Sequence, residues 1–124
     1  MKILIADSSI FILDRLESLL LETFSNAAVL RAGSYKVAMM LFKEQLPDIV
    51  LLDVSLPKSL NFLVEIKKMQ SKTFVIVLSI QNDLKMDKKY SLRGADFFLD
   101  KYYEIEKIPG IIKTQQVLTL KNAP

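Results

Sequence analysis

One short stretch, residues 49–57, constrains the fold more than any other part of the sequence. Four aliphatic residues run without interruption into Asp53, and a turn stiffened by Pro57 follows. A continuous apolar run of this length is typical of a strand buried on both faces, as in a parallel sheet covered by helices. Open α/β folds place their binding residues at the carboxyl ends of such strands. Asp53 is therefore the first candidate for a reactive group.

The composition excludes several kinds of chemistry. The sequence has 124 residues, which fits one domain over residues 1–124, and it contains neither cysteine nor histidine. Disulfides, thiolate nucleophiles, Cys/His zinc sites and histidine acid–base catalysis are therefore excluded. Any bound metal would be a hard cation held by oxygen, such as Mg²⁺ or Ca²⁺.

The charge and hydropathy patterns argue against nucleic acids and membranes as partners. The net charge is +3, and the lysines are spread among acidic residues, which is typical of solvated helix faces. The apolar runs are too short for a signal-peptide core or a membrane span. We expect a cytoplasmic protein that binds neither nucleic acid nor membranes.

The hydrophobic periodicity alternates between strands and helices along the whole sequence. The predicted strands span residues 2–6, 27–31, 48–53, 73–78 and 95–99. The predicted helices span residues 10–24, 35–45, 60–69, 84–92 and 109–118. This alternation predicts an α/β fold with a doubly wound five-stranded parallel sheet in the flavodoxin-like order 2-1-3-4-5.

Residues at the predicted helix ends support these boundaries. Ser8 or Ser9 suits the N-cap of the first helix. Gly94 suits a left-handed cap at the end of the fourth helix, and Pro109 suits the first position of the last one.

Four polar residues follow strands of the predicted sheet: Asp7, Asp53, Ser79 and Lys101. The two carboxylates would repel each other at the switch point unless a cation or protons intervened. Two acidic oxygens suit Mg²⁺, a hydroxyl can bind a phosphoryl oxygen, and a lysine can neutralise one. No GxxxxGK[ST] loop is present, so a phosphoryl group should arrive on a small donor or a partner protein. An aspartate can accept it as an acyl phosphate.

The sequence resembles a known family, the receiver domains of two-component response regulators. The resemblance rests on residues 3–7, 50–57, 76–79 and 94–101, and it covers nearly the whole sequence. Each motif is weak alone, but together and in this order, each at a predicted strand end, they are specific.

The resemblance implies a role for each residue at the predicted site. Asp53 would be the phosphoacceptor, and Mg²⁺ would be held by Asp7, Asp53 and the backbone carbonyl of Ser55. Lys101 would pair with the phosphoryl group, and the Ser79 hydroxyl would move toward the phosphoryl group. Phe98, three residues before the lysine, matches the aromatic switch position of the family.

The function implied is that of a stand-alone receiver. A histidine kinase or phosphotransfer protein would donate the phosphoryl group, and the modified receiver would change a face that binds a downstream protein target. Such a protein is a switch more than an enzyme, because it catalyses only its own phosphorylation and dephosphorylation. We expect a monomer or a weak dimer.

The sequence departs from the family pattern at several positions. Ser8 replaces the second of two adjacent acids; it is either a neutral ligand that weakens Mg²⁺ binding or simply the helix N-cap. Ile80 stands where a small residue is usual, so it could slow the entry of a donor or of water. The loop after the third strand is shortened and lacks glycine, which leaves Asn61 for any left-handed position. Tyr102 replaces the proline common after the lysine.

Three alternatives stay open. A pseudo-receiver would keep the fold and act as a non-phosphorylated interaction module, as Ser8 and Ile80 suggest. A flavodoxin-like cofactor binder is disfavoured, because no Ser/Thr/Gly-rich phosphate loop follows the first strand. The sequence could also be a domain excised from a larger regulator or hybrid kinase.

Overall fold

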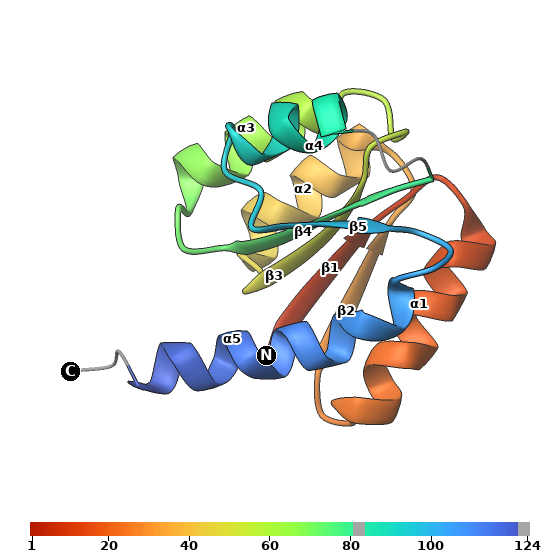
Figure 1. Cartoon of the computed structure of the whole chain (residues 1–124), viewed down its shortest axis with the longest axis vertical. Helices are drawn as coiled ribbons and strands as arrows, with labels where there is room; N and C mark the ends of the chain where they lie inside the picture. Colours follow the sequence, from red (N-terminus) through yellow and green to blue (C-terminus); the bar gives the residue numbers. More distant parts are fainter. Residues whose placement is uncertain (81–83, 122–124) are drawn as a thin grey trace.

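The computed structural model describes residues 1–80 and 84–121 and contains one parallel sheet, in the order β2-β1-β3-β4-β5 (Figure 1). The strands are β1 (Lys2–Ala6), β2 (Ala28–Ala32), β3 (Ile49–Asp53), β4 (Phe74–Ser79) and β5 (Phe97–Asp100). The helices are α1 (Ile10–Thr23), α2 (Tyr35–Gln45), α3 (Ser59–Met69), α4 (Leu84–Ser91) and α5 (Ile108–Lys121), and a short 3₁₀ helix, η1 (Ile105–Lys107), precedes α5. The predicted fold class and strand order are confirmed.

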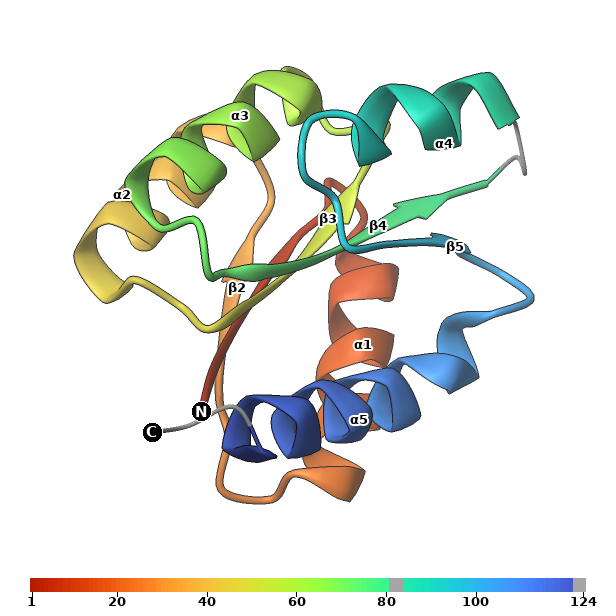
Figure 2. The ribbon, with the colours of Figure 1, turned by 60° about the vertical axis from the view of Figure 1, so that its left-hand side comes forward.

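The sheet separates two hydrophobic cores. Helices α1 and α5 cover one face, and α2, α3 and α4 cover the other (Figures 1 and 2). Alternate residues of each strand supply the two cores, so Ile3 and Ile5 pack toward α1 and α5, whereas Leu4 packs on the opposite side. Strands buried on both faces are mostly aliphatic for this reason, as the first four residues of β3 show.

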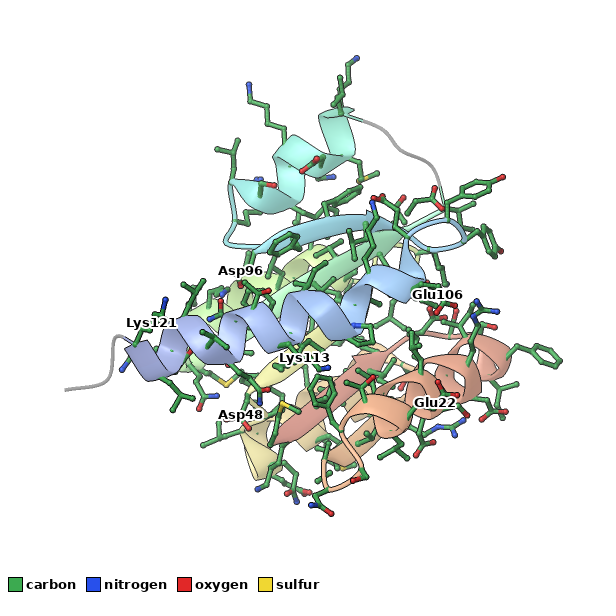
Figure 3. The ribbon with its side chains drawn as sticks, turned by 60° about the horizontal axis from the view of Figure 1, so that its bottom comes forward. Glu22, Asp48, Asp96, Glu106, Lys113 and Lys121 are labelled. Atoms are coloured by element: carbon green, nitrogen blue, oxygen red, sulfur yellow. The ribbon has the colours of Figure 1, made fainter. Side chains whose placement is uncertain are left out.

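Helix α5 is held against α1 at its amino-terminal end. Glu106, in the turn that leads into α5, forms an ion pair of 3.0 Å with Arg15 of α1 (Figure 3). Pro109 occupies the second position of α5 and not the predicted first. The 3₁₀ helix ends at Lys107, and α5 begins at the next residue, Ile108. No helix in the described ranges is long and apolar enough to cross a membrane.

Two of the predicted caps are confirmed. Ser9, and not Ser8, caps α1: its hydroxyl accepts a hydrogen bond from the amide of Ile12. Gly94 has a φ of 106°, and a pair of backbone hydrogen bonds closes the end of α4, from Gly94 to Ser91 and from Ala95 to Tyr90. This pairing is the Schellman arrangement, which requires a left-handed residue where the glycine stands.

The left-handed residue in the loop after β3 is Lys58, with a φ of 63°, and not Asn61. The loop is so short that α3 begins at Ser59, which places Asn61 inside the helix. The left-handed conformation therefore falls on the residue just before the helix, whatever the intrinsic backbone preference of that residue.

Candidate functional site

The strand register brings the four predicted residues to one edge of the sheet. Ala6 pairs with Leu52, so Asp7 and Asp53 leave neighbouring strands at the same level. Ser79 ends β4, and its carbonyl accepts a 2.7 Å hydrogen bond from the amide of Lys101, which follows β5. All four side chains are buried: Asp7, Asp53, Ser79 and Lys101.

The Lys101 ammonium lies between the two carboxylates. Its Nζ atom is 2.6 Å from Oδ2 of Asp7 and 3.2 Å from Oδ2 of Asp53. Two buried carboxylates that both contact one ammonium lie close enough to repel each other strongly, and the ammonium offsets that repulsion. The site has therefore an internal counter-ion that the fold itself supplies.

Burial raises the pKa of the Asp7 carboxyl above its ordinary value, and the nearby charge of Asp53 adds to the rise, although hydrogen bonds from Lys101 and Ser9 oppose it. Burial alone would lower the pKa of the Lys101 ammonium. Its hydrogen bond to Asp7 and the negative charges of both carboxylates outweigh that effect, so its pKa is raised. The lysine is thus held firmly in its charged form.

The carboxylate oxygens differ in their hydrogen bonding. Oδ1 of Asp7 accepts a 2.8 Å bond from the amide of Ser9, and Oδ2 of Asp53 accepts a 2.5 Å bond from the hydroxyl of Ser55. Oδ1 of Asp53 is buried and has no hydrogen-bond partner among residues 1–80 and 84–121. Buried polar atoms are rarely left without a partner, so this oxygen is available to a ligand.

These residues fit a magnesium ion. The unpaired oxygen of Asp53, the carboxylate of Asp7 and the backbone carbonyl of Ser55 are hard oxygen donors, which Mg²⁺ prefers together with several waters. No group of three or more acidic, histidine or cysteine side chains that could hold a metal occurs in the described part of the sequence. The donor set therefore suits Mg²⁺.

The remaining predicted residues neighbour the site in the sequence. Ser8 is exposed and does not cap the helix, and Ile80 is half exposed just after β4. Phe98 is half-buried, and its ring lies 6.4 Å from the ring of Tyr90 in α4, at an interplanar angle of 50°.

Two polar contacts beside the site were not predicted from the sequence. The hydroxyl of Ser55 contacts Asp53, whereas only its backbone carbonyl was expected to take part. Ser59 and Tyr90 are both buried and share a hydrogen bond. The sequence signal for Ser59 was a serine in the shortened loop, and the signal for Tyr90 was one aromatic residue in an otherwise polar helix.

A separate cavity of about 940 Å³ opens at the opposite end of the sheet, lined in part by Asp48, Phe74 and Leu120. It contains none of the carboxylates or the lysine of the site. The cavity and the candidate site therefore lie at opposite ends of the strands.

A doubly wound sheet with two carboxylates, a hydroxyl and a lysine at its carboxyl edge fits the receiver domains that the sequence resembles. The model of the response regulator receiver domain matches residues 3–113. The chain belongs to this family.

Solved structures support the same fold. The signal receiver domain of a DNA-binding response regulator (merR) from Colwellia psychrerythraea 34H has a TM-score of 0.87 at 21% identity, covering 94% of this chain and 98% of that one. A CheY-like receiver domain from Methanospirillum hungatei JF-1 has a TM-score of 0.86 at 21% identity, covering 98% of both chains.

A curated relative is the probable C4-dicarboxylate response regulator DctR of Bacillus subtilis (strain 168). It is 34% identical over 79 residues, which is 62% of this chain and 35% of the relative. The chain thus matches about a third of the length of that regulator.

Proposed function

We propose that the protein accepts a phosphoryl group on Asp53 from a histidine kinase or a phosphotransfer protein, and that this modification changes a face that binds a downstream protein. The observation that carries the proposal is the unpaired, buried oxygen of Asp53 beside the ammonium of Lys101. A nucleophile with a free lone pair and a fixed cation next to it is the arrangement that phosphoryl transfer requires. The proposal places the reaction in the cytoplasm.

The proposed step forms one bond and breaks one. An oxygen of Asp53 attacks phosphorus, the new bond makes an acyl phosphate, and the bond from phosphorus to the donor breaks with its electron pair leaving on the donor. Lys101 would turn from the carboxylate toward the phosphoryl oxygens, while the Ser55 hydroxyl would hold the other Asp53 oxygen in place. Bound Mg²⁺ would supply positive charge to the phosphoryl oxygens.

The conformational change would begin at Ser79 and Phe98. The serine would hydrogen-bond a phosphoryl oxygen, and the half-buried phenylalanine would move inward beside Tyr90, which it already faces. Hydrolysis of the acyl phosphate would reset the switch. Because the reaction ends on its own side chain, the protein would be a switch rather than an enzyme acting on a separate substrate.

Intact-protein mass after incubation with acetyl phosphate tests the proposal. We expect a gain of one phosphoryl group that requires Mg²⁺ and is absent in Asp53→Ala. A gain that persists in Asp53→Ala would contradict the assignment of the phosphoacceptor.

A second candidate, a pseudo-receiver that binds partners without phosphorylation, is favoured by the replacement of an acid by the exposed Ser8. It predicts no labelling and no Mg²⁺ binding at millimolar concentration. Ser8→Asp combined with Ile80→Ala separates the two candidates: restored labelling in this variant would show that the fold retains the chemistry and that these two positions suppress it.

A further inference from the structure

A buried row of hydroxyl groups connects helix α4 to the turn after the phosphoacceptor strand. The Ser59 hydroxyl lies 2.9 Å from the carbonyl oxygen of Val54 and 2.6 Å from the phenolic oxygen of Tyr90. Both Ser59 and Tyr90 are 4% exposed. We call this row, from Tyr90 through Ser59 to Val54, the hydroxyl relay.

The chemistry of the three groups fixes the direction of the relay. A backbone carbonyl can only accept, so the single hydroxyl hydrogen of Ser59 is donated to Val54. Ser59 must then accept, and the phenolic O–H of Tyr90 donates to it. The two bonds therefore point the same way, and each polarises the other.

One end of the relay is fixed to the candidate site. Val54 follows Asp53 directly, and its amide donates a 3.0 Å hydrogen bond to Leu78 of β4. Ser55, the next residue, donates its hydroxyl to Asp53. A movement of the Val54 carbonyl thus shifts the residue that holds the Asp53 oxygen.

The other end is fixed to α4. Tyr90 is the buried residue of that helix, and its carbonyl accepts the Schellman hydrogen bond from Ala95 and a further one from Arg93. Its ring also faces Phe98. The phenol is therefore the point at which this polar helix reaches into the core and contacts the turn.

We propose that Ser59 and Tyr90 are positioning residues, and that the hydroxyl relay couples the placement of α4 to the conformation of residues 54–58. The coupling is reciprocal because thermodynamic linkage requires it: loosening α4 loosens the turn, and loosening the turn loosens α4. It is a route from the phosphoacceptor to α4 that does not pass through Ser79. Its use in signalling rests on the proposed function, whereas the coupling itself does not.

Amide hydrogen exchange in the unmodified protein, without metal or phosphoryl donor, tests the coupling. Tyr90→Phe removes only the donor and leaves Ser59 bonded to Val54. We expect the amides of Leu56 and Ser59, which close the turn, to exchange roughly threefold to tenfold faster, the factor expected for the loss of one buried hydrogen bond. In Ser59→Ala the amide of Leu92 at the end of α4 should show a similar increase.

Tyr35→Phe is the matched control. Tyr35 packs edge-on against Phe62 in the same core, and its hydroxyl forms no hydrogen bond within the described ranges, so the same chemical change is made without cutting the relay. Exchange of the turn amides should not change in this variant. Ser59→Thr keeps the hydroxyl and should restore slow exchange in α4.

Two results would overturn the proposal. One is a Tyr90→Phe variant whose faster exchange is confined to α4, and the other is a Ser59→Thr variant that exchanges like Ser59→Ala. Amides of β1 serve as the reference for global stability. If wild-type protein takes no label from acetyl phosphate, the proposed function fails, and the exchange comparison still decides whether the relay couples the two elements.

Discussion

Two carboxylates and one ammonium, all buried, share a small volume at the candidate site. Burial of a charge costs free energy unless a partner compensates it, and here one cation compensates two anions only in part. Burial, together with the charge of Asp53, raises the pKa of Asp7. The ionised Asp7 carboxylate therefore weakens the folded state at neutral pH.

Asp7→Asn should stabilise the protein by about 1 kcal/mol at pH 7. Because the pKa of Asp7 is higher in the folded state than its ordinary value, ionisation of this carboxyl opposes folding at pH values above the folded pKa. The advantage of the asparagine should shrink as the pH falls toward the ordinary value of 3.8. Urea unfolding at several pH values measures it, and a variant less stable than wild type at pH 7 would contradict the argument.

Lys101→Met should destabilise the protein by about 2–4 kcal/mol at pH 7, because it leaves two buried carboxylates without a counter-ion. The raised pKa of the lysine means that its contribution is complete below its ordinary value of 10.5 and is lost as the pH rises through the folded pKa. Wild-type stability should therefore decline in strongly alkaline solution.

The control for this change is Lys113→Met. Lys113 is exposed on α5 (Figure 3), so its replacement should alter the unfolding free energy by less than about 0.5 kcal/mol. Equal losses in the two variants would mean that Lys101 does not act through the carboxylates.

At the scale of elements, the end of α4 depends on one glycine. A Cβ at Gly94 would lie 2.9 Å from Cγ of Lys67, and its φ of 106° strains any L-residue. Gly94→Ala should cost about 1–3 kcal/mol in urea unfolding. Gly110→Ala, within α5 and with no atom within 4 Å of the added Cβ, should instead stabilise by about 0.5–1 kcal/mol. Effects of the same sign in both variants would refute the strain argument.

The elements themselves could be predicted from the sequence. Strand β1 and helix α2 have the predicted bounds, and the other elements differ by a few residues at their ends. Aliphatic runs and helical periodicity depend on local order, so a sequence displays them directly. The same reasoning placed Asp7, Asp53, Ser79 and Lys101 at one edge, because parallel strands end at one side of a sheet.

Contacts that depend on side-chain direction could not be predicted. Helix α4 has few apolar residues, yet Tyr90 anchors it through a hydroxyl that only the three-dimensional arrangement places beside Ser59. The left-handed residue was misplaced for a related reason. Loop length, and not residue preference, put the positive φ on Lys58.

At the scale of the whole molecule, Mg²⁺ should raise stability, since it would bind only the folded site. For a dissociation constant near 1 mM, 10 mM Mg²⁺ adds about 1.4 kcal/mol to the free energy of unfolding. Thermal unfolding followed by circular dichroism, against NaCl of equal ionic strength, measures the effect. The increase should vanish in Asp53→Ala; an increase that remains would place the ion elsewhere.

The division of the interior by the sheet has a consequence for how the molecule can move. The core under α1 and α5 is almost wholly aliphatic, whereas the core under α2, α3 and α4 contains Tyr90, Phe98 and the hydroxyl relay. The first half therefore depends on apolar packing that has no preferred direction, whereas the second also holds directional hydrogen bonds. Substitutions in the aliphatic half should change how much folded protein exists, and those in the other half should also change how α4 lies against the turn after β3.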